Sequence, residues 1–98
     1  MGTMQQLIEA AGGKVVGPKV NLNGTMGKDL LRQVTDAGRG VRKAMEALGE
    51  AAPNGRDYLP QGAGDYQLAA KQHADRMARL KSVYDELQDV AELIADQL

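Results

Sequence analysis

The sequence lacks cysteine, tryptophan and phenylalanine, and the aromatic residues among its 98 residues are three tyrosines. Without cysteine there is no disulfide framework and no thiolate chemistry, which fits a reducing cytoplasm. The core must be built from Leu, Val, Ile, Met and Ala. This mixture suits helix-on-helix packing better than a β-sheet, which favours β-branched and aromatic residues. A chain of this length forms one domain at most, so we expect a single domain over residues 1–98.

Long apolar runs and a large excess of one charge are also lacking. No run approaches the roughly 18 residues that a membrane span needs, and the N-terminus lacks the basic region and apolar stretch of a signal peptide. The net charge of −1 argues against a generally basic surface that would seek phosphates, although it leaves room for a local basic patch. These features predict a soluble cytoplasmic protein that does not associate with a membrane.

The first 24 residues predict a short helix followed by an extended arm. Thr3 and Gln6 are spaced as a capping box, and Gly12 with Gly13 would end the helix. Its apolar face would consist of Met4, Leu7, Ile8 and Ala11. From residue 14 to 22 several β-branched residues favour extended backbone, whereas Pro18 argues against a central strand. We therefore expect an arm that packs across the helices.

Residues 25–52 predict a helix with an unbroken heptad seam, in which apolar residues recur at spacings of four and three. The seam consists of Leu30, Val34, Ala37, Val41, Ala44, Leu48 and Ala51, and it is widened by Leu31, Met45 and Ala52. Either Asn23 or Thr25 would serve as the N-cap. Gly38 and Gly40 each cost about 1 kcal/mol relative to Ala inside a helix, so we interpret them as the mark of a close helix crossing.

A loop over residues 53–64 and a long helix over residues 65–98, with Asp65 as its N-cap, complete the chain. The second seam consists of Tyr66, Ala70, His73, Met77, Leu80, Tyr84, Leu87, Ala91, Ile94 and Leu98. A loop of about a dozen residues lets the two helices pack side by side and antiparallel. The predicted fold class is therefore all-α, a long antiparallel helical hairpin with a short N-terminal helix and an extended arm. Its apolar face is large for a lone hairpin, so a homodimeric four-helix bundle stays open.

The sequence predicts no catalytic residue, no cofactor and no metal site. His73 is the single histidine, and it falls on the seam without a carboxylate one turn away, so we expect a half-buried structural histidine near the loop end of the hairpin. The carboxylates on the helix faces occur without the histidine-containing motif of di-iron bundles. They are therefore interpreted as solvated side chains.

Two groups of residues are candidates for binding a partner. The first is a central basic face with Arg39, Arg42, Arg76 and Arg79, which could contact phosphates, although no aromatic residues are interleaved with it. The second is the loop, because structured loops concentrate function more often than helix faces do. Its candidates are Arg56, Asp57, Tyr58 and Gln61. The alternative for the loop is a self-satisfied turn, with Arg56 paired to a carboxylate and Tyr58 packed over the hairpin end.

The segment Leu22-Asn23-Gly24-Thr25, the loop Asn54-Gly55-Arg56-Asp57-Tyr58 and the long charged helix with His73 resemble small proteins encoded by tailed phages and prophages of Gram-negative bacteria. The resemblance implies a bacterial cytoplasmic setting and a phage accessory role, and it implies no activity. We therefore expect a non-enzymatic accessory protein that binds a host or phage protein, for example to inhibit a host or anti-phage defence factor. Two alternatives stay open, a nucleic-acid-associated protein that uses the central basic face, and a virion or assembly component.

Overall fold

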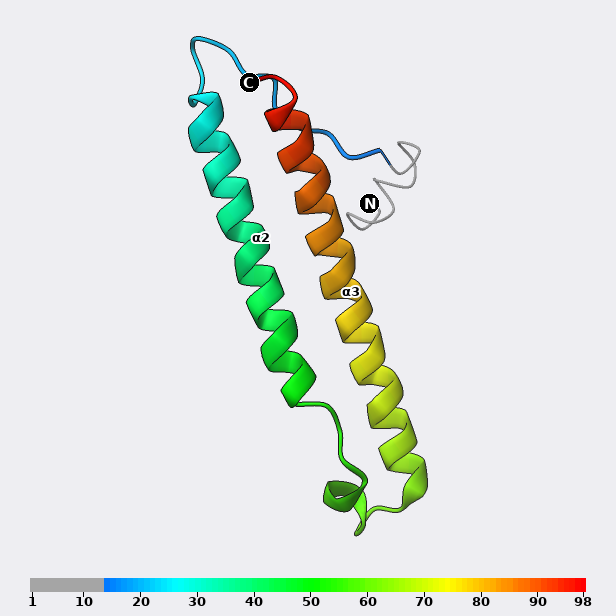
Figure 1. The fold of residues 1–98 in the computed structure, drawn as a ribbon. Helices are drawn as coiled ribbons and strands as arrows, with labels where there is room; N and C mark the ends of the chain where they lie inside the picture. Colours follow the sequence, from blue (N-terminus) through cyan, green and yellow to red (C-terminus); the bar gives the residue numbers. More distant parts are fainter. Residues whose placement is uncertain (1–13) are drawn as a thin grey trace. The chain divides into compact units, whose positions relative to one another are not determined.

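A computed structural model describes residues 14–98. In this range the chain contains the helix α2 (Gly27–Glu50), the short 3-10 helix η1 (Gly55–Tyr58) and the helix α3 (Ala63–Ala95), and it contains no β-strand (Figure 1). The predicted all-α helical hairpin is confirmed. The expected short helix around Thr3 and Gln6 lies outside the described residues.

The two long helices begin and end at slightly different residues from those expected. The carbonyl of Met26 accepts hydrogen bonds from the N–H groups of Asp29 and Leu30, both at 3.0 Å, so α2 begins after Met26 rather than after Asn23 or Thr25. The helix α3 begins at Ala63, which places Asp65 in its first turn instead of at the N-cap. A carboxylate in that turn is still favourable, because the first turn carries the positive end of the helix dipole.

The described residues form two compact units, each of which contains parts of both long helices. One unit consists of residues 14–36 together with Glu86–Leu98, and the other consists of Ala37–Asp85. The loop and all eight residues of the two candidate binding groups belong to the second unit.

The core of the first unit centres on Ile94, the one fully buried large side chain among residues 14–98. The arm lies against the same end of α3, since a Cβ on Gly17 would come within 3.0 Å of the Cβ of Leu93. The start of α2 is equally close to its surroundings, because a Cβ on Gly27 would overlap the side chain of Leu98. Gly17 therefore permits a close approach that a larger residue would disturb, whereas the overlap at Gly27 involves the end of the exposed Leu98 side chain, which can move aside.

The side-chain amide of Gln97 holds the arm. Its Nε2 donates to the carbonyl oxygens of Pro18 at 2.9 Å and of Leu93 at 3.0 Å, and its Oε1 accepts from the N–H of Val20 at 2.8 Å. The amide thus pairs with the extended backbone much as a peptide group of a neighbouring strand would. The predicted arm is present, and its contact with the helices is a hydrogen-bonded one at the end of α3.

In the second unit, α3 buries the seam that the sequence predicts. Every predicted seam residue of α3 in this unit is half-buried, namely Tyr66, Ala70, His73, Met77, Leu80 and Tyr84. The position of His73 is therefore the expected one.

The seam of α2 is rotated relative to the prediction. Ala37, Ala44 and Ala51 are exposed, whereas Gly38 is buried and Met45 is half-buried beside Val41 and Leu48. The apolar stripe is wide enough for two heptad registers, one through the alanines and one through their C-terminal neighbours. The hairpin buries the second register because covering a methionine removes more apolar surface from water than covering an alanine.

The expected close crossing at the two glycines of α2 is not found. Gly38 faces the ring of Tyr84, but a Cβ there would lie 3.9 Å from Cε2 of Tyr84, which is ordinary contact. Gly40 is exposed, and a Cβ added to it would meet no atom within 4 Å. Packing against the described residues therefore requires neither glycine.

Candidate functional site

The loop that joins α2 to α3 is built by local hydrogen bonds. The Oδ1 atom of Asn54 accepts from the N–H of Arg56 at 2.9 Å and caps η1, while the carbonyl of Asn54 accepts from the N–H of Asp57 at 3.0 Å. The carbonyl of Tyr58 then accepts from the N–H groups of Gln61 and Gly62, each at 3.1 Å. These bonds satisfy the backbone locally, so the loop keeps a defined conformation without a large core beneath it.

Gly62 closes this loop in a conformation that favours glycine. Its φ is +95°, in the left-handed region, where a side chain is strained. The chain turns there and enters α3 at the next residue. The turn brings the first turn of α3 back to η1, and the rings of Tyr58 and Tyr66 lie 6.1 Å apart at an angle of 55°. This tilted pairing is a favourable aromatic geometry.

A hollow of about 400 Å³ opens beside the tyrosine pair. Its lining consists of Gly55, Arg56, Tyr58, Leu59, Gly62, Ala63 and Tyr66. Leu59 is 76% exposed at this hollow. An apolar hollow with an exposed leucine and an arginine at its edge can accept an apolar side chain and pair with a nearby carboxylate.

The structure separates the four loop candidates. Arg56 and Tyr58 line the hollow, whereas Asp57 and Gln61 are exposed and do not line it. The side chain of Arg56 contacts Oδ1 of Asn54, which lies 3.4 Å from its Nε. The carboxylate partner expected for Arg56 in a self-satisfied turn is not found among residues 14–98. The packing of Tyr58 over the hairpin end is found, against Tyr66.

Sequence reasoning missed Leu59 and Tyr66 as parts of this surface. Tyr66 belongs to the predicted helix seam, which it does join as a half-buried residue, and its second role depends on how the loop folds back. The signal that could have identified Leu59 is its position: it is a large apolar residue in a loop, between a tyrosine and a proline.

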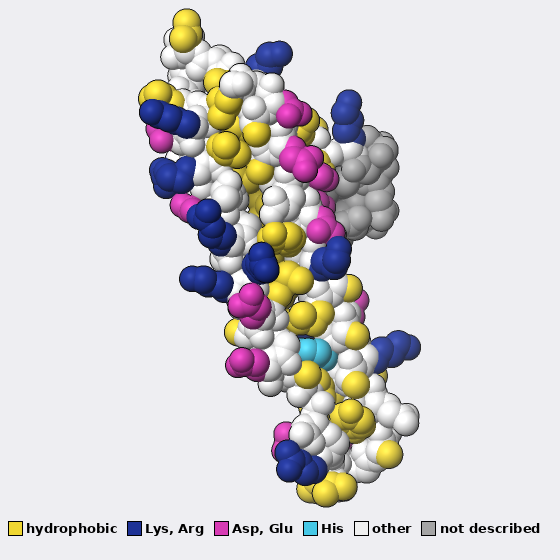
Figure 2. Space-filling view, in the orientation of Figure 1, with side chains coloured by type: hydrophobic (Ala, Val, Ile, Leu, Met, Phe, Trp, Pro, Cys, Tyr) yellow, Lys and Arg dark blue, Asp and Glu magenta, His cyan; other side chains and the backbone are white. Residues whose placement is uncertain are grey.

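Three residues of the central basic face line two separate grooves, and Arg39 lines neither of them. Arg76 and Arg79 line a groove of about 400 Å³ together with Leu48, Leu80 and Val83. Arg42 lines a different groove of about 240 Å³ together with Met45, Lys81, Tyr84 and Asp85. Figure 2 shows hydrophobic side chains between the helices on the visible face of this unit, with the single histidine among them.

Most of these cations have a carboxylate one turn away on the same helix. Nε of Arg79 lies 3.0 Å from Asp75, and Nε of Arg42 lies 3.8 Å from Glu46. Nζ of Lys81 lies 2.8 Å from Asp85, and this hydrogen bond, reinforced by the charge of Asp85, raises the pKa of Lys81. All these pairs are solvent-exposed, so they stabilise the helices only slightly. They do, however, neutralise much of the positive potential that a phosphate would need.

Chemistry-bearing clusters are scarce in the described part of the chain. Residues 14–98 contain no group of three His, Asp or Glu side chains placed to hold a metal ion. None of the helices in this range is long and apolar enough to cross a membrane. No protein-family model, curated protein or solved structure matches the chain.

Proposed function

We propose that this chain acts by binding another protein, as a non-enzymatic accessory protein, and that the hairpin end around Leu59 is a contact surface. The observation that carries the proposal is the exposure of Leu59 beside the hollow formed by Tyr58, Tyr66 and Arg56. Exposed apolar patches rimmed by polar residues mark protein-binding surfaces, and tyrosine and arginine are enriched among the residues that carry binding energy. The partner would present an apolar side chain to the hollow and a carboxylate to Arg56.

The phage setting of this role, including inhibition of a host or defence factor, rests on the resemblance of the sequence and remains part of the proposal. The nucleic-acid alternative has less support, because Arg42 and Arg79 each lie beside a carboxylate on their own helix. A binding assay with duplex and single-stranded DNA over a range of salt concentrations tests this alternative, since phosphate contacts weaken steeply with salt. Mass spectrometry of purified particles tests a virion role.

The protein-binding proposal is tested by comparing two leucines that are both exposed. The immobilised chain, Leu59→Asp and Leu22→Asp are each incubated with lysate of a Gram-negative bacterium, and retained proteins are identified by mass spectrometry. Leu22 lies outside the loop and its unit, so Leu22→Asp is the matched control. We expect a protein that is retained by the unmodified chain and by Leu22→Asp, and at least about tenfold less by Leu59→Asp, since burying a carboxylate in an apolar hollow is unfavourable.

Equal retention by all three chains would show that the hairpin end is not the contact surface. Retention of no protein by the unmodified chain would argue against the proposed function in that host. Circular dichroism of both variants serves as the folding control, and unchanged helicity is expected because both leucines are exposed.

A further inference from the structure

The groove lined by Leu48, Leu80 and Val83 is an apolar surface that the second unit does not cover. Val83 is 45% exposed, and Arg76 and Arg79 stand at the groove's edge. Within residues 37–85 the only buried residue is Gly38, so no side chain of this unit is fully enclosed. Helix pairs depend on tertiary packing of their apolar faces for most of their stability. In this unit a large part of the apolar faces of the two helices is therefore left without a packing partner.

The exposed register of α2 adjoins the same groove. Ala44 is exposed and lies one helical turn before Leu48, which lines the groove. Ala37 lies a further two turns back and is also exposed. Small side chains beside an apolar groove allow another helix to approach to the 8–10 Å that is typical of packed helices.

We propose that a second copy of this chain covers the groove, in an antiparallel two-fold dimer. The distribution of charge along the chain favours a second copy as the partner. Within α3 and the residues that follow it, residues 63–85 contain four Lys and Arg and three Asp and Glu, a net charge of +1, whereas residues 86–98 contain no Lys or Arg and four Asp and Glu, a net charge of −4. Two copies of α3 that run in opposite directions place the positive part of each helix against the acidic part of the other, as a two-fold interface requires of a self-complementary surface.

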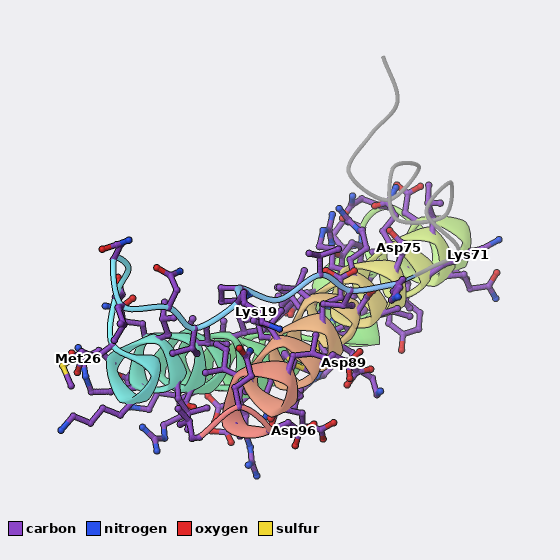
Figure 3. The ribbon with its side chains drawn as sticks, turned by 90° about the horizontal axis from the view of Figure 1, so that it is seen from above. Lys19, Met26, Lys71, Asp75, Asp89 and Asp96 are labelled. Atoms are coloured by element: carbon purple, nitrogen blue, oxygen red, sulfur yellow. The ribbon has the colours of Figure 1, made fainter. Side chains whose placement is uncertain are left out.

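Individual residues show the same complementarity. Arg76 lines the groove, whereas Arg79 beside it is already paired with Asp75. The last turns of α3 carry Glu86, Asp89 and Glu92, and Asp96 follows the helix; Asp89 and Asp96 are labelled in Figure 3. A parallel dimer would instead bring like charges together. This inference goes beyond the proposed function, because Leu59 and the hollow at the hairpin end take no part in it.

The test compares Val83→Glu with Ser82→Glu by sedimentation over micromolar to millimolar concentrations. Ser82 is exposed, does not line the groove and is the adjacent residue, so the pair is matched in charge and in helix position. The carboxylate introduced by Val83→Glu would stand four residues after Arg79, a spacing at which opposite charges favour the isolated helix, so folding should survive. We expect the unmodified chain and Ser82→Glu to dimerise alike and Val83→Glu to dimerise at least about tenfold more weakly.

The orientation is tested by spin-label distances, which the absence of cysteine makes simple. The variant Gln67→Cys places one label in the second turn of α3 in each copy. Because α3 is 33 residues long and Gln67 lies one turn in from its start, the labels of an antiparallel dimer whose helices overlap fully should be about 35–40 Å apart. A distance below about 20 Å would show a parallel dimer and overturn the antiparallel arrangement.

Two further outcomes overturn the second copy as the occupant. One is a chain that stays monomeric at millimolar concentration. If Val83→Glu then lowers the melting temperature of that monomer and Ser82→Glu does not, Val83 contributes to packing within the monomer and the groove needs no second copy. The other is a dimer that both variants weaken equally, which would place the interface elsewhere.

Discussion

Replacing Gly40 by alanine should stabilise this protein, because the glycine lies within a helix and serves no packing role. Glycine in a helix interior is about 0.8–1.0 kcal/mol less favourable than alanine, and part of the difference arises because glycine has more conformational freedom in the unfolded chain. A Cβ at position 40 would meet no atom within 4 Å. Neither a clash nor a new contact should therefore alter that value.

The expected gain is about 0.5–1 kcal/mol in the free energy of unfolding, which for a domain of this size corresponds to roughly 2–8 °C in melting temperature. Urea denaturation followed by circular dichroism at a fixed protein concentration measures it, and the fixed concentration matters because self-association would add to the apparent stability. Gly38→Ala should behave similarly, since its added Cβ would lie at 3.9 Å from the ring of Tyr84.

The matched contrast is Gly17→Ala in the arm, which should lower the free energy of unfolding instead of raising it. The added Cβ would lie 3.0 Å from the Cβ of Leu93, an atom close to the backbone that cannot swing aside. Position 17 is not helical, so no helix propensity offsets the clash. A decrease in stability on Gly40→Ala, or equal changes at positions 17 and 40, would refute the reasoning, and the former would indicate a partner packed against that face of α2.

Two further predictions concern single hydrogen-bonded side chains. Gln97→Glu should release the arm at neutral pH, because a carboxylate oxygen would replace the amide group that donates to the carbonyls of Pro18 and Leu93. Release of the arm should speed the hydrogen exchange of the Val20 amide. Unchanged exchange at Val20 would contradict the prediction. Asp85→Asn should lower the pKa of Lys81, which Asp85 raises in the native chain, and NMR titration of Nζ reports the change. Because folding raises the pKa of Lys81, the pair stabilises the folded state at a pH below the unfolded pKa of lysine, and this stability is lost as the pH rises through the folded pKa. Asp85→Asn should remove that pH dependence of stability. An unaltered Lys81 titration in this variant would show that the pair does not persist in solution.

Much of the helical architecture was predictable because heptad spacing is a property of the sequence alone. The seam of α3 has a single apolar register in the second unit, from Tyr66 to Tyr84, and all its predicted members there are half-buried. The helix ends were not predictable to the residue. Met26 rather than a polar cap precedes α2, because the arm and the turn before it set where the helix can begin.

The candidate surface at the hairpin end was only partly predictable for a different reason. Arg56 and Tyr58 stood out as polar and aromatic residues among turn formers, whereas Leu59 and Tyr66 join them only through the turn at Gly62. Contacts between residues on either side of a turn depend on its dihedral angles, and those follow from hydrogen bonds such as the Asn54 cap that a residue pattern does not specify.

The rotated seam of α2 bears on the proposed dimer, because the hairpin buries only one of two heptad registers on this helix. The sequence carries two heptad registers on one helix, and α3 uses the one that contains Gly38 and Met45. The neighbouring register contains Ala37 and Ala44, both exposed. Alanine favours the helix at either position, and its small side chain also leaves room for a second helix beside the groove. Polar substitution at position 44 should therefore leave the hairpin folded and weaken association, whereas the same substitution at Met45 should destabilise the hairpin itself.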